Sequence, residues 1–191
     1  MIINYIMFTE WNKFKGWDIL EYFLKNPNTK IHLNGLARLL KVSSRTALIY
    51  CNGYFKDNIL KKEKNANSIS FYLNNNIHLV KQLKKIWFLR ALQKNNVINN
   101  FLKKNKGIMD VMLYGGYCSG EYSNNSDIDI LIITNSEKID CTSFEDFAHG
   151  FNKELGLVKL TSCKWDELLK KKDSFALSVI KNNISLLEET I

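Results

Sequence analysis

The sequence has little proline and no segment of low complexity. Pro27 is the only proline in 191 residues, and no stretch is rich in glycine, serine or proline. Long flexible linkers and disordered regions usually have such a composition, so neither is indicated. Because 46% of the residues are hydrophobic, the chain can bury one good core or two small ones. We therefore expect one or two compact domains, joined by a short or helical connection.

Paired cysteines and a long apolar start are also missing. The four cysteines are scattered and show no C-x-x-C spacing, so neither a zinc site nor a disulfide framework is indicated. Residues 1–8 are mostly apolar, but Glu10, Asn12 and Lys13 follow soon after. This start is too short and too polar for a signal peptide or a membrane span. We expect a soluble, cytoplasmic protein with no membrane partner.

Acidic residues are absent from one long segment, and charge is unevenly distributed. Residues 81–107 carry 8 Lys or Arg and no Asp or Glu. Residues 1–80 carry 11 basic and 5 acidic residues, whereas residues 108–191 carry 8 and 14. A basic front half is thus joined to an acidic back half. This asymmetry favours two modules with different partners, the front one suited to polyanions.

The first 75 residues predict three helices and a hairpin. Apolar residues at helical spacing, and two β-prone runs around a polar turn, predict helices over 17–24, 31–40 and 44–56 and strands over 59–64 and 69–73. Ser43 or Ser44 is well placed to cap the third helix. This order of elements resembles a winged helix-turn-helix domain over about residues 15–75.

The winged-helix resemblance implies a role in binding double-stranded DNA. The third helix would read the duplex and the wing would touch phosphates. The residues assigned to these contacts are Ser44, Arg45, Thr46, Lys56, Lys61, Lys62 and Lys64. Winged helices also serve as docking or dimerisation modules, so a protein partner is the alternative.

The remaining sequence predicts a helical connector and an α/β domain. Apolar positions three or four apart over 77–105 predict one long or two shorter amphipathic helices. Beyond them, the pattern predicts strands over 111–114, 128–133, 157–161 and 184–187 and helices over 144–155, 165–172 and 174–181. Together they make a small mixed sheet flanked by helices. The predicted division is a first domain over 1–76, a connector over 77–107 and a second domain over 108–191.

The residues that carry chemistry lie in the second domain. Asp127 and Asp129 are two apart on a predicted strand, so we expect them to project from the same face. Two close carboxylates repel each other unless a cation lies between them, and hard oxygen ligands of this kind favour Mg²⁺ or Mn²⁺. Upstream, Gly115 and Gly116 follow a buried strand and precede a predicted helix start, where backbone N–H groups can approach a phosphate.

These residues also carry a family resemblance. The run Leu113-Tyr114-Gly115-Gly116, followed by Gly120 and Ser126-Asp127-Ile128-Asp129, resembles the signature of the DNA polymerase β-like nucleotidyltransferases, particularly their minimal members. The resemblance extends over about residues 108–190. A winged helix ahead of such a domain is an arrangement associated with prokaryotic, especially archaeal, chains.

The resemblance implies a nucleotidyltransferase fold and a metal-dependent activity. It implies transfer of a nucleoside monophosphate from an NTP to a hydroxyl acceptor, with Mg²⁺ or Mn²⁺ as cofactor. Asp127 and Asp129 would be the catalytic, metal-holding residues. Gly115, Gly116 and Ser126 would bind the nucleotide or support its loop.

The sequence also departs from this family. Many minimal members have arginines where this chain has Tyr117 and Ser119. Active members usually carry a third carboxylate near the position of Lys159. Without it, the proton of an attacking hydroxyl passes to water, to the substrate, or to a carboxylate such as Glu154 or Asp166. Two alternatives to an enzyme follow: a DNA-binding regulator with a degenerate, nucleotide-sensing domain, and a toxin–antitoxin component that acts on a partner protein.

Overall fold

The structure of the protein is a computed structural model, which describes residues 14–65 and 68–187. Contacts divide the chain into two units, Met1–Leu83 and Lys84–Ile191. The boundary falls inside helix α5 (His78–Lys94), which belongs to the expected connector. In the described part of the chain, every helix is too short or too polar to span a membrane.

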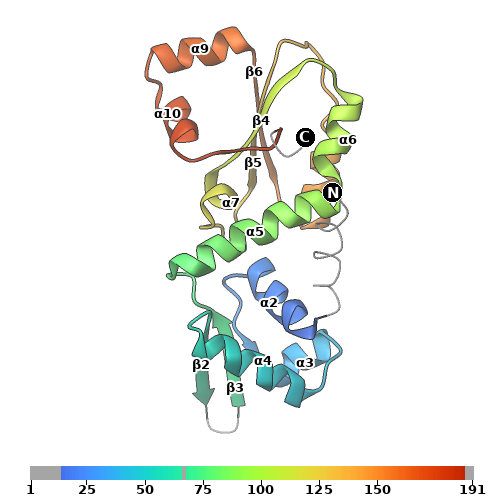
Figure 1. Ribbon diagram of the computed structural model, residues 1–191, viewed down its shortest axis with the longest axis vertical. Helices are drawn as coiled ribbons and strands as arrows, with labels where there is room; N and C mark the ends of the chain where they lie inside the picture. The colour runs from blue at the N-terminus through green and yellow to red at the C-terminus, as the bar shows by residue number, and fades with distance from the viewer. Residues whose placement is uncertain (1–13, 66–67, 188–191) are drawn as a thin grey trace. The chain divides into compact units, whose positions relative to one another are not determined.

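The first unit contains helices and a small antiparallel sheet (Figure 1). Its elements are α2 (Lys15–Lys25), β1 (Ile31–His32), α3 (Leu33–Leu39), α4 (Ser44–Lys56), β2 (Leu60–Asn65) and β3 (Ser68–Leu73). The strand order is β1-β3-β2, and both pairings are antiparallel. The tip of the predicted hairpin, residues 66–67, lies outside the described residues.

The predicted third helix is confirmed, whereas the second is wrong at its start. The Ser43 hydroxyl accepts a hydrogen bond from the Thr46 N–H at 3.0 Å, and this N-cap begins α4. The helix predicted over 31–40 begins only at Leu33. Ile31 and His32 instead pair with β3, which satisfies their backbone groups through a strand much later in the chain.

The second unit has a mixed sheet. After α5 its elements are α6 (Val97–Lys104), β4 (Ile108–Tyr114), α7 (Gly115–Ser119), β5 (Ile128–Thr134), α8 (Thr142–Gly150), β6 (Leu155–Leu160), α9 (Ser162–Lys170), α10 (Ser174–Lys181) and β7 (Ile184–Ser185). The strand order is β6-β5-β4-β7, in which β5 and β6 are parallel and the other pairs are antiparallel. The predicted small mixed sheet with flanking helices is therefore confirmed.

The helix predicted over 144–155 is too long. α8 ends at Gly150, and Leu155 is the first residue of β6. Asn152 takes a left-handed conformation with φ 52°, and the Lys153 N–H donates to the Ala148 carbonyl at 2.9 Å. These two features turn the chain out of the helix and into the strand.

Alternate residues of β5 face two different layers. On one face, Leu131 and Ile133 pack in a buried cluster with Trp165 of α9 and with Ala176 and Val179 of α10. Figure 1 shows α9 and α10 on one side of the sheet and α6 on the other. The residues that alternate with this cluster, Ile128, Ile130 and Ile132, are almost fully buried on the opposite face. On the face of β5 that packs against α9 and α10, the first residue is Asp129, and it is the one charged residue of that face of the strand.

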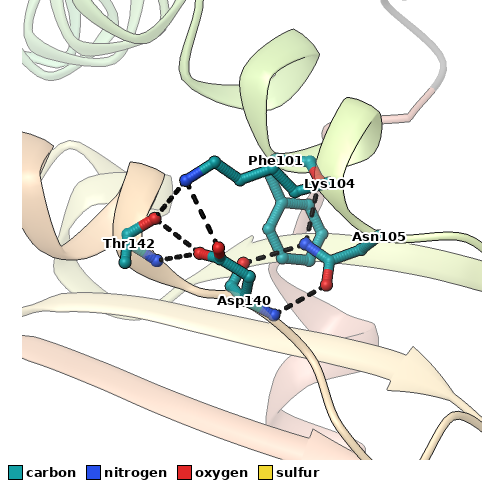
Figure 2. A network of polar contacts seen from close by, with 5 residues as sticks. All are labelled: Phe101, Lys104, Asn105, Asp140 and Thr142. Carbon is teal, nitrogen blue, oxygen red and sulfur yellow. Dashed lines mark hydrogen bonds and ion pairs between the residues drawn. The ribbon is translucent and has the colours of Figure 1, made fainter.

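A polar network ties α6 to the segment before α8 (Figure 2). The Asn105 side chain donates to the carbonyls of Phe101 and Asp140 and accepts from the Asp140 N–H at 2.7 Å. The Thr142 hydroxyl and N–H donate to the Asp140 carboxylate, and Lys104 lies 3.3 Å from it. The hydrogen bonds from Thr142, followed by Lys104, hold the pKa of Asp140 below its ordinary value. The network thus ends α6 and positions the start of α8 through one buried amide, Asn105.

Candidate active site

Asp129 lies near the start of the central strand β5, between two neighbours on the same face of the sheet. Tyr114 is its register partner on β4, and Gly156 is its partner on β6. Residues directly opposite each other on adjacent strands project from the same face. Burial, followed by the charge of Asp129, raises the pKa of the Tyr114 phenol, which also contacts the ring of Phe175 edge-on at 5.6 Å.

Two glycines leave the space that the Asp129 carboxylate occupies. A Cβ on Gly115 would lie 2.1 Å from Asp129 Oδ2, and a Cβ on Gly156 would lie 2.6 Å from Asp129 Oδ1. Gly115 also has a φ of 69°, a conformation that side chains disfavour. Glycine at both positions is therefore a condition for this placement of the carboxylate. Gly115 was predicted to bind phosphate, whereas Gly156 was not among the predicted site residues, although an isolated glycine in a strand signals a close approach.

Asp127 lies just before β5 and is exposed. The prediction that both aspartates lie on the strand is therefore wrong for Asp127. Its position is set by the next residue, because the Ile128 N–H donates to the Glu154 carbonyl at 2.9 Å. The two carboxylates still interact: burial and then the charge of Asp127 raise the pKa of Asp129. A half-buried carboxylate between two glycines, repelled by an exposed carboxylate nearby, is suited to bind a divalent cation.

The turn after β4 is stabilised by backbone hydrogen bonds from residues 121 and 122. Gly115 and Gly116 form the first two residues of the short helix α7. The Gly116 carbonyl accepts from the N–H groups of Glu121 and Tyr122 at 2.9 and 3.1 Å. A Cβ on Gly116 would lie 3.3 Å from the Tyr122 Cα, so a side chain there would crowd the returning backbone. Gly120 ends α7 with a φ of 76°.

Ser126 stabilises the loop that leads to Asp127. Its hydroxyl accepts a hydrogen bond from the Ser123 N–H at 2.8 Å, and its own N–H donates to the Ser123 carbonyl at 3.3 Å. These bonds close the turn over residues 123–126. Ser126 therefore lies in the loop where the sequence analysis placed it, and its contacts are with that loop.

Among the described residues, no third carboxylate joins the two aspartates. Lys159 is the register partner of Ile132, so it lies on the face of the sheet opposite Asp129, where its ammonium donates to the Glu137 carbonyl at 2.5 Å. The residues of β6 on the Asp129 face are Gly156, Val158 and Leu160. Over residues 14–65 and 68–187, no three His, Cys, Asp or Glu side chains gather as a metal-binding group.

Glu154 and Asp166, the two carboxylates suggested as proton acceptors in place of a third acid, lie at different ends of the sheet. Glu154 is exposed and directly precedes β6, next to Asp127 in the strand pairing. Asp166 is exposed on α9, whose first residue, Ser162, donates to the Asn135 side chain beyond the far end of β5. Of these two residues, Glu154 is the one that the pairing brings to the Asp127 end of the sheet.

Lys153 is a basic residue near Asp127 that was not among the predicted site residues. Its ammonium donates to the carbonyl of Asn124 in the loop before Asp127. Burial lowers the pKa of Lys153, and the charge of Asp127 opposes this effect. The lysine therefore brings positive charge to the Asp127 carboxylate. No sequence pattern marked it, because its proximity depends on the pairing of β5 with β6.

In the first unit, the helix residues assigned to DNA lie at the start and end of α4. Arg45 and Lys56 are exposed. The Ser44 hydroxyl donates to the Asn34 side chain at 3.1 Å, and the Thr46 hydroxyl contacts Ser43 at 2.7 Å. Ser44 and Thr46 therefore have local partners at the helix start, whereas Arg45 and Lys56 extend from the helix into solvent.

The three wing lysines do not share one face. Lys62 and Lys64 alternate with Lys61 along β2 and project from the opposite face. The Lys62 ammonium donates to the Asn52 side chain of α4 at 3.0 Å and lies 5.9 Å from the Phe55 ring centroid. Lys62 is therefore half-buried against α4, while Lys61 and Lys64 are exposed.

The second unit thus combines a mixed β-sheet, flanked by helices, with two neighbouring carboxylates, Asp127 and Asp129. The short helix α7, which begins with two glycines, lies beside them. Such a site is suited to a divalent cation and to phosphate groups. Residues 96–190 match the family model described as Polymerase beta, Nucleotidyltransferase. The match supports a nucleotidyltransferase domain in the C-terminal half of the chain and takes in α6, which the sequence analysis assigned to the connector. Comparisons of the chain with curated proteins and with solved structures gave no match.

Proposed function

We propose that the C-terminal domain is a nucleotidyltransferase that uses Mg²⁺ or Mn²⁺ to move a nucleoside monophosphate from an NTP to a hydroxyl acceptor. The enclosure of the Asp129 carboxylate by Gly115 and Gly156, beside Asp127, is the observation that carries the proposal. Nucleotidyl transfer as the general chemistry is supported by the family match.

Asp127 and Asp129 are the residues that would hold the metal. A divalent cation bound there would neutralise the two carboxylates and stabilise charge on the phosphates. In the reaction, the acceptor oxygen bonds to the α-phosphorus while the bond to the bridging oxygen breaks, so pyrophosphate leaves. The two aspartates would supply the negative charge that attracts the cation to this end of the sheet, with Asp129 half-buried and Asp127 exposed.

The remaining residues of the site would bind and orient the triphosphate. The turn at Gly115 and Gly116 lets the backbone come close to phosphate oxygens, because no side chain intervenes. Lys153 would supply positive charge near Asp127. Ser126 would hold the loop that carries Asp127 in place.

A second candidate function is a DNA-binding regulator whose C-terminal domain binds nucleotide without transferring it. The positions of β6 that share a face with Asp129 hold glycine and aliphatic residues, and no described third acid joins the pair. The proton of the acceptor would then have to pass to water, to substrate or to Glu154. This observation favours the regulator, and retention of both aspartates favours the enzyme.

For the N-terminal unit we propose a winged helix-turn-helix domain that binds double-stranded DNA, with docking to a protein as its alternative. The order α2-β1-α3-α4-β2-β3 and the sheet order β1-β3-β2 support this assignment. Arg45, Lys56 and Lys64 offer exposed positive charge on α4 and on the helix side of the wing. A toxin–antitoxin role would use the same unit to hold a partner protein.

Label transfer from an NTP tests the enzyme. The protein would be incubated with each α-phosphate-labelled NTP and Mg²⁺, alone, with RNA and with cell extract. The Asp127→Asn/Asp129→Asn variant is the test, and Glu145→Gln/Asp146→Asn, on the exposed surface of α8, matches its change of charge. We expect transfer that survives in the control and disappears in the test variant.

Nucleotide binding separates the two candidates. NTP bound in the presence of Mg²⁺ but never transferred would make the regulator the better assignment. Equal NTP affinity in the wild type and the Asp127→Asn/Asp129→Asn variant would refute the site itself.

A further inference from the structure

Lys84 is a buried lysine in the second unit that the proposed reaction does not use. This residue of helix α5 is only 2% exposed. The ammonium donates to the Tyr122 carbonyl at 2.6 Å and lies 4.3 Å from the centroid of the same residue's ring. One lysine therefore holds both the backbone and the ring of Tyr122.

Tyr122 in turn supports the turn that begins α7. Its N–H donates to the Gly116 carbonyl at 3.1 Å, and its Cα would be 3.3 Å from a Cβ on Gly116. Its ring stacks on Tyr117, with centroids 4.2 Å apart and planes within 10°. Tyr117 lies in the same short helix as Gly116. A shift of Tyr122 would therefore move α7 at two places.

A role in packing alone does not account for a lysine at this position. Burying an ammonium costs free energy unless hydrogen bonds and favourable charge interactions compensate. A methionine or leucine would fill a similar volume beside the Tyr122 ring without this cost. Lysine supplies what these residues lack, a directional, charge-assisted hydrogen bond to the Tyr122 carbonyl, which places that carbonyl accurately.

We infer that Lys84 is a positioning residue for the turn Gly115–Gly120: by fixing Tyr122, it places Gly116 and, through Gly115, the space occupied by the Asp129 carboxylate. This inference rests on the proposed function, in which the turn receives the triphosphate. The chain of contacts is Lys84 to Tyr122, Tyr122 to Gly116, and Gly115 to Asp129. Lys84 contacts no reacting atom in this scheme and acts through Tyr122.

Hydrogen exchange and nucleotide binding test the inference together. Lys84→Met removes the hydrogen bond and keeps an apolar stem, while Lys94→Met changes an exposed lysine of the same helix. We expect Lys84→Met to speed amide exchange over residues 116–122 and to weaken MgATP binding about tenfold, as expected for one charge-assisted hydrogen bond. Lys94→Met should leave both unchanged.

A second variant, Lys84→Gln, covers the case in which Lys84→Met does not fold, and MgATP binding by the wild type tests the proposed function separately. If Lys84→Met does not fold, Lys84→Gln, which keeps a neutral donor, is measured in its place. Unchanged exchange over 116–122 would overturn the inference, as would weaker MgATP binding without faster exchange there. If the wild type binds no MgATP, the proposed function fails, and the exchange comparison alone still decides whether Lys84 orders the turn.

Discussion

The Asp129 carboxylate fills the space in which Gly156 would carry a side chain, with Oδ1 2.6 Å from the Cβ position. The two residues are register partners in the parallel pairing of β5 and β6. The glycine thus acts on the orientation of the acid, because any larger residue would turn the carboxylate away. Gly156 therefore affects the proposed metal site although it has no side chain of its own, because it determines where the Asp129 carboxylate can lie.

Gly156→Ala should therefore impair metal-dependent nucleotide binding more than stability. The added methyl meets the end of a flexible side chain, so Asp129 can rotate away at little cost to the fold. We expect MgATP affinity to fall by about tenfold or more, measured by calorimetry, with a nearly unchanged melting temperature. Gly150→Ala is the matched control, because a Cβ there meets nothing within 4 Å. Equal affinities in the two variants would contradict the cradle.

Asp129→Asn should stabilise the metal-free protein at neutral pH. Burial and the charge of Asp127 raise the pKa of Asp129 in the folded state, so ionising this group costs stability. Below the pKa of the unfolded chain, about 3.9, both states are protonated and the two proteins should be equally stable. As pH rises through the raised folded pKa, the variant should become the more stable protein. Urea titrations from pH 3 to pH 8 in chelator would measure this difference, and no change with pH would refute the predicted shift.

Lys153→Gln should weaken the binding of ATP but not the binding of adenosine, which has no phosphates. The lysine contributes charge near Asp127, so we expect the ATP dissociation constant to rise about three- to tenfold, and the adenosine dissociation constant to stay unchanged. Lys138→Gln, an exposed lysine of the same domain, controls for net charge. A loss that is equal for ATP and adenosine would show that the lysine only supports the Asn124 loop.

Asn105→Ala should destabilise the second unit without changing its chemistry. The buried amide makes three hydrogen bonds, to Phe101 and to both backbone groups of Asp140. Their loss should cost about 2 kcal/mol, a fall of roughly 4–8 °C in melting temperature for a chain of this size. Asn100→Ala changes an exposed asparagine of α6 and should have little effect. Thermal unfolding followed by circular dichroism would distinguish the two variants.

If the first unit binds DNA through α4, Lys64 should matter more than Lys61. Both side chains are exposed, but the strand pairing puts Lys64 on the face shared with Lys62, which contacts α4. Lys64→Ala should lower the salt slope of duplex binding by about 1, the value expected for one phosphate contact. Fluorescence anisotropy at several salt concentrations would measure it. An equal effect of Lys61→Ala would show that DNA contacts the other face of the wing.

The sequence by itself determined the elements whose signals are local. A serine cap at Ser43 or Ser44 and helical spacing predicted α4, and α10 was predicted over the residues it occupies, because a helix depends on neighbours three and four residues away. The glycine and aspartate run also marked the candidate site, because its members follow one strand and begin the next.

Only the tertiary structure decided features that depend on residues far apart in the chain. Ile31 and His32 form a strand because β3 is available to pair with them, and His32 bonds to Ser70, 38 residues later. The same separation lies between Lys84 and Tyr122. The register of β6 against β5 turns Lys159 away from Asp129 and brings Gly156 beside it. A glycine in a predicted strand can signal a close approach, but which residue approaches it depends on strand register, and register is a property of packed neighbours that no local pattern reveals.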